Sequence, residues 1–201
     1  MRGAVCARCW DAVVPPVPLV PCSVPPHITL AAAIGPYADS LREVVHALKY
    51  DQRSTIAWHL AQRMRDAGAG ALFGADAVVP VPLHRARERS RGFNQARELA
   101  RHLGMPMLDA LARVRETASQ ADLPAARRAA NVRGAFAVRS EALVADCILV
   151  LVDDVSTTGA TLNACAGVLL GAGAKEVRAL TAARAPLKGT RSTTTATHSR
   201  R

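Results

Sequence analysis

The stretch from residue 147 to residue 161, CILVLVDDVSTTGAT, constrains the fold more than any other part of the sequence. It opens with six consecutive apolar residues, a pattern typical of a parallel strand that is buried on both faces. Two aspartates follow, then small and hydroxyl-bearing residues, and then an apolar segment, 162–170, that is predicted as a helix. Because a further strand is expected at 177–183, this region forms a βαβ unit and the fold class is α/β.

The other elements are predicted from apolar periodicity and from the residues that end each segment. Helices are expected at 55–67 and 94–103, and a third is expected to be capped by Asp39 or Ser40 and to reach about Tyr50. A strand is expected at 77–81, and a short strand or turn at 107–114. Residues 115–133 are polar, basic and weakly periodic, so we expect a functional loop there.

Composition divides the chain into three parts. Residues 1–35 are rich in proline and cysteine and are predicted to form a small N-terminal flap. Residues 36–186 hold the α/β domain, whose mostly parallel sheet is expected to be flanked by helices. Residues 187–201 are rich in threonine, serine and arginine and are predicted to be a basic, disordered tail.

Charge and hydropathy narrow the classes of ligand and location. The formal net charge is +10, of which the last fifteen residues contribute four basic groups and no acidic ones. A basic protein suits polyanionic ligands, such as nucleic acid or a pyrophosphate ester, and the charge does not choose between them. The first ten residues contain no apolar run of signal-peptide length, and the longest apolar run is too short to span a bilayer. We therefore expect a cytoplasmic protein without membrane insertion.

The polar turn after the buried strand has the chemistry of a phosphate and ribose site. In α/β proteins ligands bind at the carboxyl edge of the sheet, and the N-terminus of the following helix offers free N–H groups and a positive dipole to a phosphate. Asp153 and Asp154 are suited to accept hydrogen bonds from a ribose diol. An ordinary strand–turn–helix accounts for the aspartate pair alone, but not for the whole string. The predicted phosphate ligands are Ser156, Thr157, Thr158, Gly159, Ala160 and Thr161.

Two groups of motifs resemble known families. The string VLVDDVSTTGAT at 150–161 resembles the signature with which type I phosphoribosyltransferases bind phosphoribosyl pyrophosphate (PRPP). VPVPLH at 79–84 and RGFNQ at 91–95 resemble segments of the ComF family, whose members are similar to competence protein F. Further matches follow in family order across about residues 1–185: LKY at 48–50, QADL at 120–123, Arg128, Asn131 and GAF at 134–136. The resemblance implies a type I phosphoribosyltransferase-like fold.

The resemblance also implies roles for particular residues. Asp153 and Asp154 would be the catalytic pair, with Mg²⁺ bound together with PRPP. The loop after the first predicted strand would hold pyrophosphate, which makes Arg85, Arg89 and Arg91 candidate anion ligands, because guanidinium groups bind phosphate strongly. For any one of these arginines the alternative is a solvated surface charge. Residues 115–133 would form the mobile loop that closes over PRPP.

The N-terminal cysteines suggest a zinc site that lacks one ligand. Cys6 and Cys9 form a CxxC pair and Cys22 follows at a suitable distance, but position 25, where the ComF resemblance implies another cysteine, is proline. His27 is a candidate fourth ligand, which would give a Cys3His site for Zn²⁺. The alternative is a flap of reduced cysteines without metal.

Two functions follow from these observations. The first is a phosphoribosyltransferase, which transfers the phosphoribosyl group of PRPP to an unidentified nitrogen acceptor and releases pyrophosphate. The second is a non-enzymatic accessory or regulatory protein that uses the PRPP fold for ligand sensing, or that binds DNA or a competence-protein partner. The basic tail is weak support for the second, because short basic tails are usually solvated.

Overall fold

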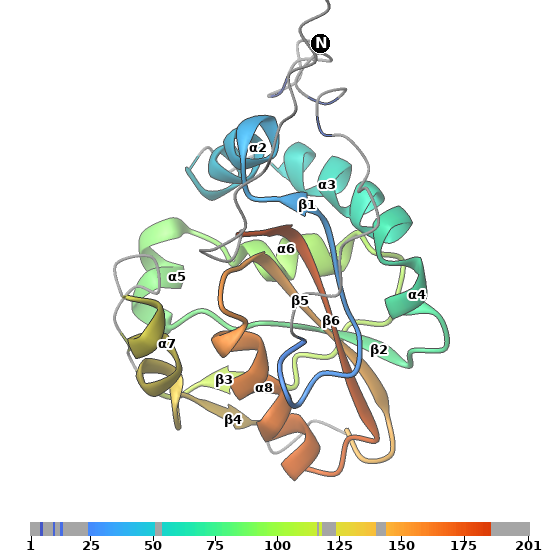
Figure 1. Ribbon diagram of the computed structural model, residues 1–201, viewed down its shortest axis with the longest axis vertical. Coiled ribbons are helices and arrows are strands. Elements are labelled where there is room, and N and C mark those ends of the chain that lie inside the picture. Colours follow the sequence, from blue (N-terminus) through green and yellow to red (C-terminus); the bar gives the residue numbers. More distant parts are fainter. Residues whose placement is uncertain are drawn as a thin grey trace, which may run out of the picture.

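The computed structural model describes residues 5, 10, 13, 24–50, 54–115, 117, 124–139 and 144–185. At its centre lies a four-stranded parallel sheet with the strand order β1-β6-β5-β2 (Figure 1). Its strands are β1 (Ala31–Pro36), β2 (Ala77–Pro80), β5 (Ile148–Ser156) and β6 (Glu176–Arg184). A small antiparallel pair, β3 (Leu111–Arg113) and β4 (Phe136–Val138), lies beside it.

Helices cover both faces of the large sheet. One face packs on α2 (Asp39–Tyr50), α3 (Ser54–Ala67) and α6 (Gln95–Arg101), with Val78, Val150 and Leu180 pointing into that core. The other face packs on α8 (Ala160–Gly171) and the β3–β4 pair, with Val79, Leu149 and Leu151. The remaining helices are α4 (Ala69–Leu72), α5 (Arg85–Arg91) and α7 (Ala125–Val132).

The apolar residues of β5 lie at the centre of the fold. Residues 149–152 of β5 are fully buried, and their side chains alternate between the two cores. The α/β class with a parallel sheet flanked by helices is therefore confirmed, as are the predicted helices α2, α3, α6 and α8 and the predicted strands β2, β5 and β6. Strand β5 is longer than expected. Asp153, Val155 and Ser156 still pair with β6, so the turn before α8 occupies only residues 157–159.

Three parts of the chain differ from the sequence-based expectation. The prediction that 115–133 lacks a regular element was wrong for its second half, where α7 forms and buries Val132 against the core that contains α8. Helix α5 was not predicted either, because the segment RARERSR has no apolar periodicity. Strand β1 begins before the boundary predicted after residue 35, since Ala31–Pro36 pairs with β6 along its whole length.

Some predictions fall outside the described residues. These include Cys6, Cys9 and Cys22 of the predicted flap and the whole of the predicted tail, 187–201. No helix in the described ranges combines the length and apolar character that a membrane span requires.

Candidate functional site

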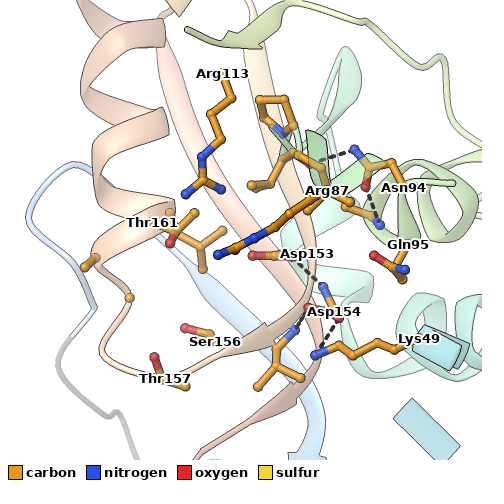
Figure 2. A pocket seen from close by; sticks show the side chains of 18 of the residues that line it. Lys49, Arg87, Asn94, Gln95, Arg113, Asp153, Asp154, Ser156, Thr157 and Thr161 are labelled. Atoms are coloured by element: carbon orange, nitrogen blue, oxygen red, sulfur yellow. Dashed lines mark hydrogen bonds and ion pairs between the residues drawn. The ribbon is translucent and has the colours of Figure 1, made fainter. Parts of the chain in front are cut away.

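A cavity of about 480 Å³ opens at the carboxyl ends of β2 and β5 (Figure 2). One wall is continuous in sequence and consists of residues 153–162, which run from the end of β5 through the turn into the first turn of α8. The other walls come from α2, from the segment that joins β2 to α5, from α5 itself, from the start of α6 and from β3. Both predicted catalytic aspartates and all six predicted phosphate ligands line this one cavity.

The acidic pair is held in a fixed arrangement by the backbone and by Lys49. The Asp154 N–H donates to Asp153 Oδ1 at 2.8 Å, and the Val155 N–H donates to Asp154 Oδ1 at 2.7 Å. The second oxygen of Asp154 lies 2.9 Å from Lys49 Nζ, which reaches it from the last turn of α2 (Figure 2). The side chains of Lys49 and Asp154 are only 19% and 14% exposed, so this ion pair is shielded from most of the solvent.

Burial and neighbouring charges shift the pKa values of Asp153 and Lys49. Burial, and then the charge of Asp154, raise the pKa of Asp153 to about 8. Burial also acts to lower the pKa of Lys49, but the adjacent Asp154 carboxylate more than offsets it, and the pKa lies above its ordinary value. Protonation of Asp153 is thus favoured at neutral pH, next to an Asp154 side chain that pairs with Lys49.

The turn between β5 and α8 leads directly into the N-terminus of a helix. Its last residue, Gly159, has a φ of 74° and caps α8 without a side-chain hydrogen bond to the first turn. A Cβ at this position would lie 2.6 Å from Cγ of Pro25, so only glycine fits both the backbone angle and the space. The hydroxyl of Thr158 accepts from the Ala160 N–H at 3.4 Å. Helix N-termini with free N–H groups and hydroxyl neighbours bind phosphate.

Asn94 builds the opposite wall. Its side-chain oxygen accepts from the Ala96 N–H at 2.9 Å and so caps α6, while its amide donates to the Val81 carbonyl at 3.1 Å. Asn94 is 5% exposed. This buried side chain ties the end of β2 to the start of α6, which fixes the position of the loop expected to face pyrophosphate.

The predicted arginines are distributed differently from expectation. Arg85 and Arg89 are exposed on α5 and are not among the residues that line the cavity, and the side chain of Arg91 lies outside the described part of the chain. The arginines that do line the cavity are Arg87, from α5, and Arg113, from β3. Sequence reasoning missed both. Arg87 lies in the same arginine-rich segment, but which face of α5 points inward is set by packing, and nothing local to Arg113 marks it.

His27, the predicted fourth zinc ligand, contacts α8. Its backbone N–H donates to Asn163 Oδ1 at 3.0 Å, and its ring Nδ1 lies 3.3 Å from the Asn163 carbonyl oxygen. The three cysteines proposed to join it lie outside the described residues, so the zinc site stays a prediction.

Comparison with known proteins decides the family. A family model described as "Phosphoribosyl transferase domain" matches residues 88–199. DNA utilization protein YhgH of Salmonella typhimurium is 36% identical over 192 residues, which cover 88% of this chain and 82% of the relative. Competence protein F of Haemophilus influenzae is 34% identical over 163 residues, which cover 76% of this chain and 71% of the relative. The chain belongs to the ComF family of phosphoribosyltransferase-domain proteins.

A solved structure adds a more distant likeness for this ComF-family chain. It is described as the allosteric regulatory enzyme of purine biosynthesis, is 21% identical, and matches with a TM-score of 0.44 over 68% of this chain and 30% of the other.

Proposed function

We propose that this ComF-family protein binds PRPP with Mg²⁺ and transfers the phosphoribosyl group to a nitrogen acceptor, with release of pyrophosphate. The observation that carries the proposal is the single cavity that brings the Asp153–Asp154 pair together with residues 156–161, which run from the end of β5 through the turn into α8. A diol-binding acidic pair next to a phosphate-binding helix N-terminus suits a ribose 5-phosphate.

In this proposal each part of the wall binds one part of the ligand. The N–H groups and hydroxyls of residues 157–161 hold the 5-phosphate. Asp154, fixed by its ion pair with Lys49, accepts a hydrogen bond from a ribose hydroxyl. In the absence of the metal ion, the raised pKa of Asp153 favours its protonated form, which is able to donate one to a ribose oxygen.

The donor set also fits Mg²⁺. This ion prefers oxygen ligands and usually binds through one or two carboxylates plus substrate phosphates, rather than in an all-protein cage. Asp153 and Asp154 both line the cavity, and binding of the ion would displace the proton of Asp153, so that both side chains would offer carboxylate oxygens. The ligand would bring the phosphate oxygens. When bound, Mg²⁺ would neutralise charge on the departing pyrophosphate.

The reaction needs positioning more than covalent chemistry from the protein. The bond between C1 of the ribose and the pyrophosphate oxygen breaks, the bond between C1 and the acceptor nitrogen forms, and the nitrogen loses a proton. Pyrophosphate leaves with the electron pair of the broken bond. The protein holds the two reactants in line and stabilises the charge that develops on the leaving group, which are the large contributions in such transfers.

The test is pyrophosphate release from PRPP in the presence of Mg²⁺ and a panel of nucleobases and other nitrogen heterocycles. We expect acceptor-dependent release by the parent protein and a loss of at least about 100-fold in the Asp153→Asn plus Asp154→Asn variant. Asp109→Asn is a matched control, because Asp109 is exposed and pairs with Arg97 at 2.6 Å, outside the residues that line the cavity. Acceptor-independent release, or equal rates in the parent and the double variant, would contradict the proposal.

A non-enzymatic role is the second candidate, and it is favoured by the names of the relatives and by the net positive charge of this chain. The names of the relatives refer to DNA utilization and competence, and this chain carries a formal net charge of +10. Such a protein would retain PRPP binding without turnover, or bind DNA through its basic surface. Single-stranded DNA binding, measured before and after removal of residues 187–201, tests whether the basic tail contributes.

A further inference from the structure

One step of the proposed transfer, the removal of a proton from the acceptor nitrogen, needs a residue besides those that hold PRPP. A positioned side chain that takes such a proton typically contributes a factor of about 10² to 10⁴ to the rate. In the proposed function the turn at 157–161 holds the 5-phosphate, and Asp153 and Asp154 hold the ribose and the metal ion. A base for this step is therefore expected on another wall of the same cavity.

Histidine is the side chain best suited to this step, because an imidazole gains and loses a proton between about pH 5 and 8. Among the described residues that line the cavity, His46 is the histidine. Asp154 pairs with a lysine, and the raised pKa of Asp153 favours its protonated form. The other ionisable side chains in the cavity are cationic or keep their proton at neutral pH, and these are Tyr37, Lys49, Arg87 and Arg113.

Helix α2 holds His46 next to the acidic pair. His46 and Lys49 have i, i+3 spacing, so they lie on the same face of the helix, about one turn apart. Lys49 Nζ lies 2.9 Å from Asp154 Oδ2, which anchors this face of the helix beside the acidic pair. Val45 and Leu48 of the same helix are fully buried in the core. The position of His46 is therefore set by core packing and by an ion pair within the site.

His46 also lies on the side from which the acceptor would approach. In a direct displacement at C1, the entering nitrogen and the departing pyrophosphate stand on opposite sides of that carbon. Strand β5, which carries the acidic pair, has β2 on one side and β6 and β1 on the other. The segment after β2 is expected to face pyrophosphate, whereas α2 follows β1. Figure 2 shows Lys49 of α2 reaching the acidic pair from the side opposite Arg87 of α5. The acceptor would thus enter past α2, next to His46.

We propose that His46 is the general base that takes the proton of the acceptor nitrogen. The nitrogen forms its bond to C1 with its lone pair, while pyrophosphate leaves with the electron pair of the broken C1–O bond. The N–H bond of the acceptor then breaks, and its electron pair stays on the nitrogen. The proton passes to an imidazole nitrogen of His46 and from there to solvent, to which this exposed side chain has access. The inference rests on the proposed function for its reaction, and it narrows the acceptor to nitrogen compounds that carry an N–H at neutral pH.

The first measurement asks whether His46 lies at the bound ligand, and it does not require turnover. Proton NMR follows the imidazole signals of the parent, which are assigned with His46→Gln and His102→Gln. His102, at the end of α6, is the matched control because it does not line the cavity. Addition of Mg²⁺ and PRPP should move the His46 signal and leave the His102 signal in place. By calorimetry both variants should bind PRPP within about twofold of the parent, because a base for the acceptor proton leaves the contacts with PRPP intact.

The second measurement is pyrophosphate release from PRPP with the panel of nucleobases and other nitrogen heterocycles. In His46→Gln we expect kcat to fall about 100-fold or more, and added imidazole to restore part of the rate. In the parent, kcat/KM should decline toward acid as the imidazole is protonated, and this decline should be absent from His46→Gln. His102→Gln should behave as the parent does, and unliganded thermal midpoints check that both variants fold.

The outcomes separate the base from the proposed function. If the parent releases pyrophosphate and His46→Gln does so at a similar rate, or keeps the decline toward acid, the assignment of His46 is overturned and the transfer itself stands. A His46 signal that stays in place while PRPP binds would also overturn the assignment. If the parent binds PRPP and releases no pyrophosphate with any acceptor, the proposed function is contradicted, and the base is contradicted with it.

Discussion

Replacing Lys49 by methionine removes one charge from the centre of the site and keeps most of the length of the side chain. Lys49 Nζ and Asp154 Oδ2 are 2.9 Å apart, and both side chains are more than four-fifths buried. The substitution leaves the Asp154 carboxylate without its cation, next to a second buried carboxyl group. Breaking a buried pair in this way costs about 3–5 kcal/mol, and the partial exposure here reduces the expected loss to about 2–4 kcal/mol.

Urea unfolding at pH 7 measures this loss, with Lys175→Met as an exposed lysine control that should change stability by less than about 0.5 kcal/mol. In a double-mutant cycle with Asp154→Asn, the two losses should fall short of additivity by at least about 1 kcal/mol. Because the Asp154 carboxylate holds the pKa of Lys49 above its ordinary value of 10.5 against the effect of burial, the stabilisation is complete below pH 10.5 and declines as pH rises through the folded-state pKa. Additive losses, or a change within that of the control, would refute the reasoning.

Three further predictions concern single residues. Burial raises the pKa of Asp153 from its ordinary value to about 8, so deprotonation of this residue destabilises the parent as pH rises from about 4 to 8. In urea unfolding, the stability advantage of Asp153→Asn over the parent should therefore grow over that pH interval and then level off. An advantage that does not depend on pH would contradict this prediction. Gly159→Ala should destabilise by at least about 1–2 kcal/mol because φ is 74° there, whereas Gly171→Ala at the other end of α8, where a Cβ meets nothing within 4 Å, should not destabilise. The hydrogen bond from Arg178, and then that from the Thr29 hydroxyl, hold the pKa of Glu176 at about 2. Glu176→Gln should therefore lower the free energy of unfolding by up to about 1 kcal/mol at neutral pH, and this loss should vanish as pH falls from 4.5 toward 2. A loss that persists in acid would argue against the Glu176–Arg178 interaction as its cause.

The sequence predicts those helices and strands whose own residues show a clear apolar pattern. The continuous apolar run of β5 and the apolar face of α2 each indicate which residues are buried, so both elements were predicted correctly. Strand β1 has the sequence AAAIGP, which contains one strong strand-former, and it is a strand because β6 pairs with it. Helix α5 was missed because it has a single apolar residue, and α7 was missed because its apolar residues are mostly small alanines within a longer polar, basic stretch.

The same distinction applies to the site. Asp153, Asp154 and the turn that follows are contiguous, and the chain itself carries them from a buried strand to a helix N-terminus, so the sequence places them together. Arg87 and Arg113 meet only because α5 and β3 are brought to one cavity by the fold. Their partner Thr117 is likewise visible only in three dimensions.

The central claim, that this cavity binds PRPP, is tested most directly by thermal unfolding with and without Mg²⁺ and PRPP. Each protein is compared with its own unliganded midpoint, because Asp153→Asn and Asp154→Asn change stability by themselves. At a ligand concentration of about 100 times the dissociation constant, binding should stabilise the parent by about 2.7 kcal/mol, a rise in midpoint of about 5–10 °C. A rise in the parent and none in the double variant is the predicted result. No rise in the folded parent, or an equal rise in both proteins, would contradict the claim.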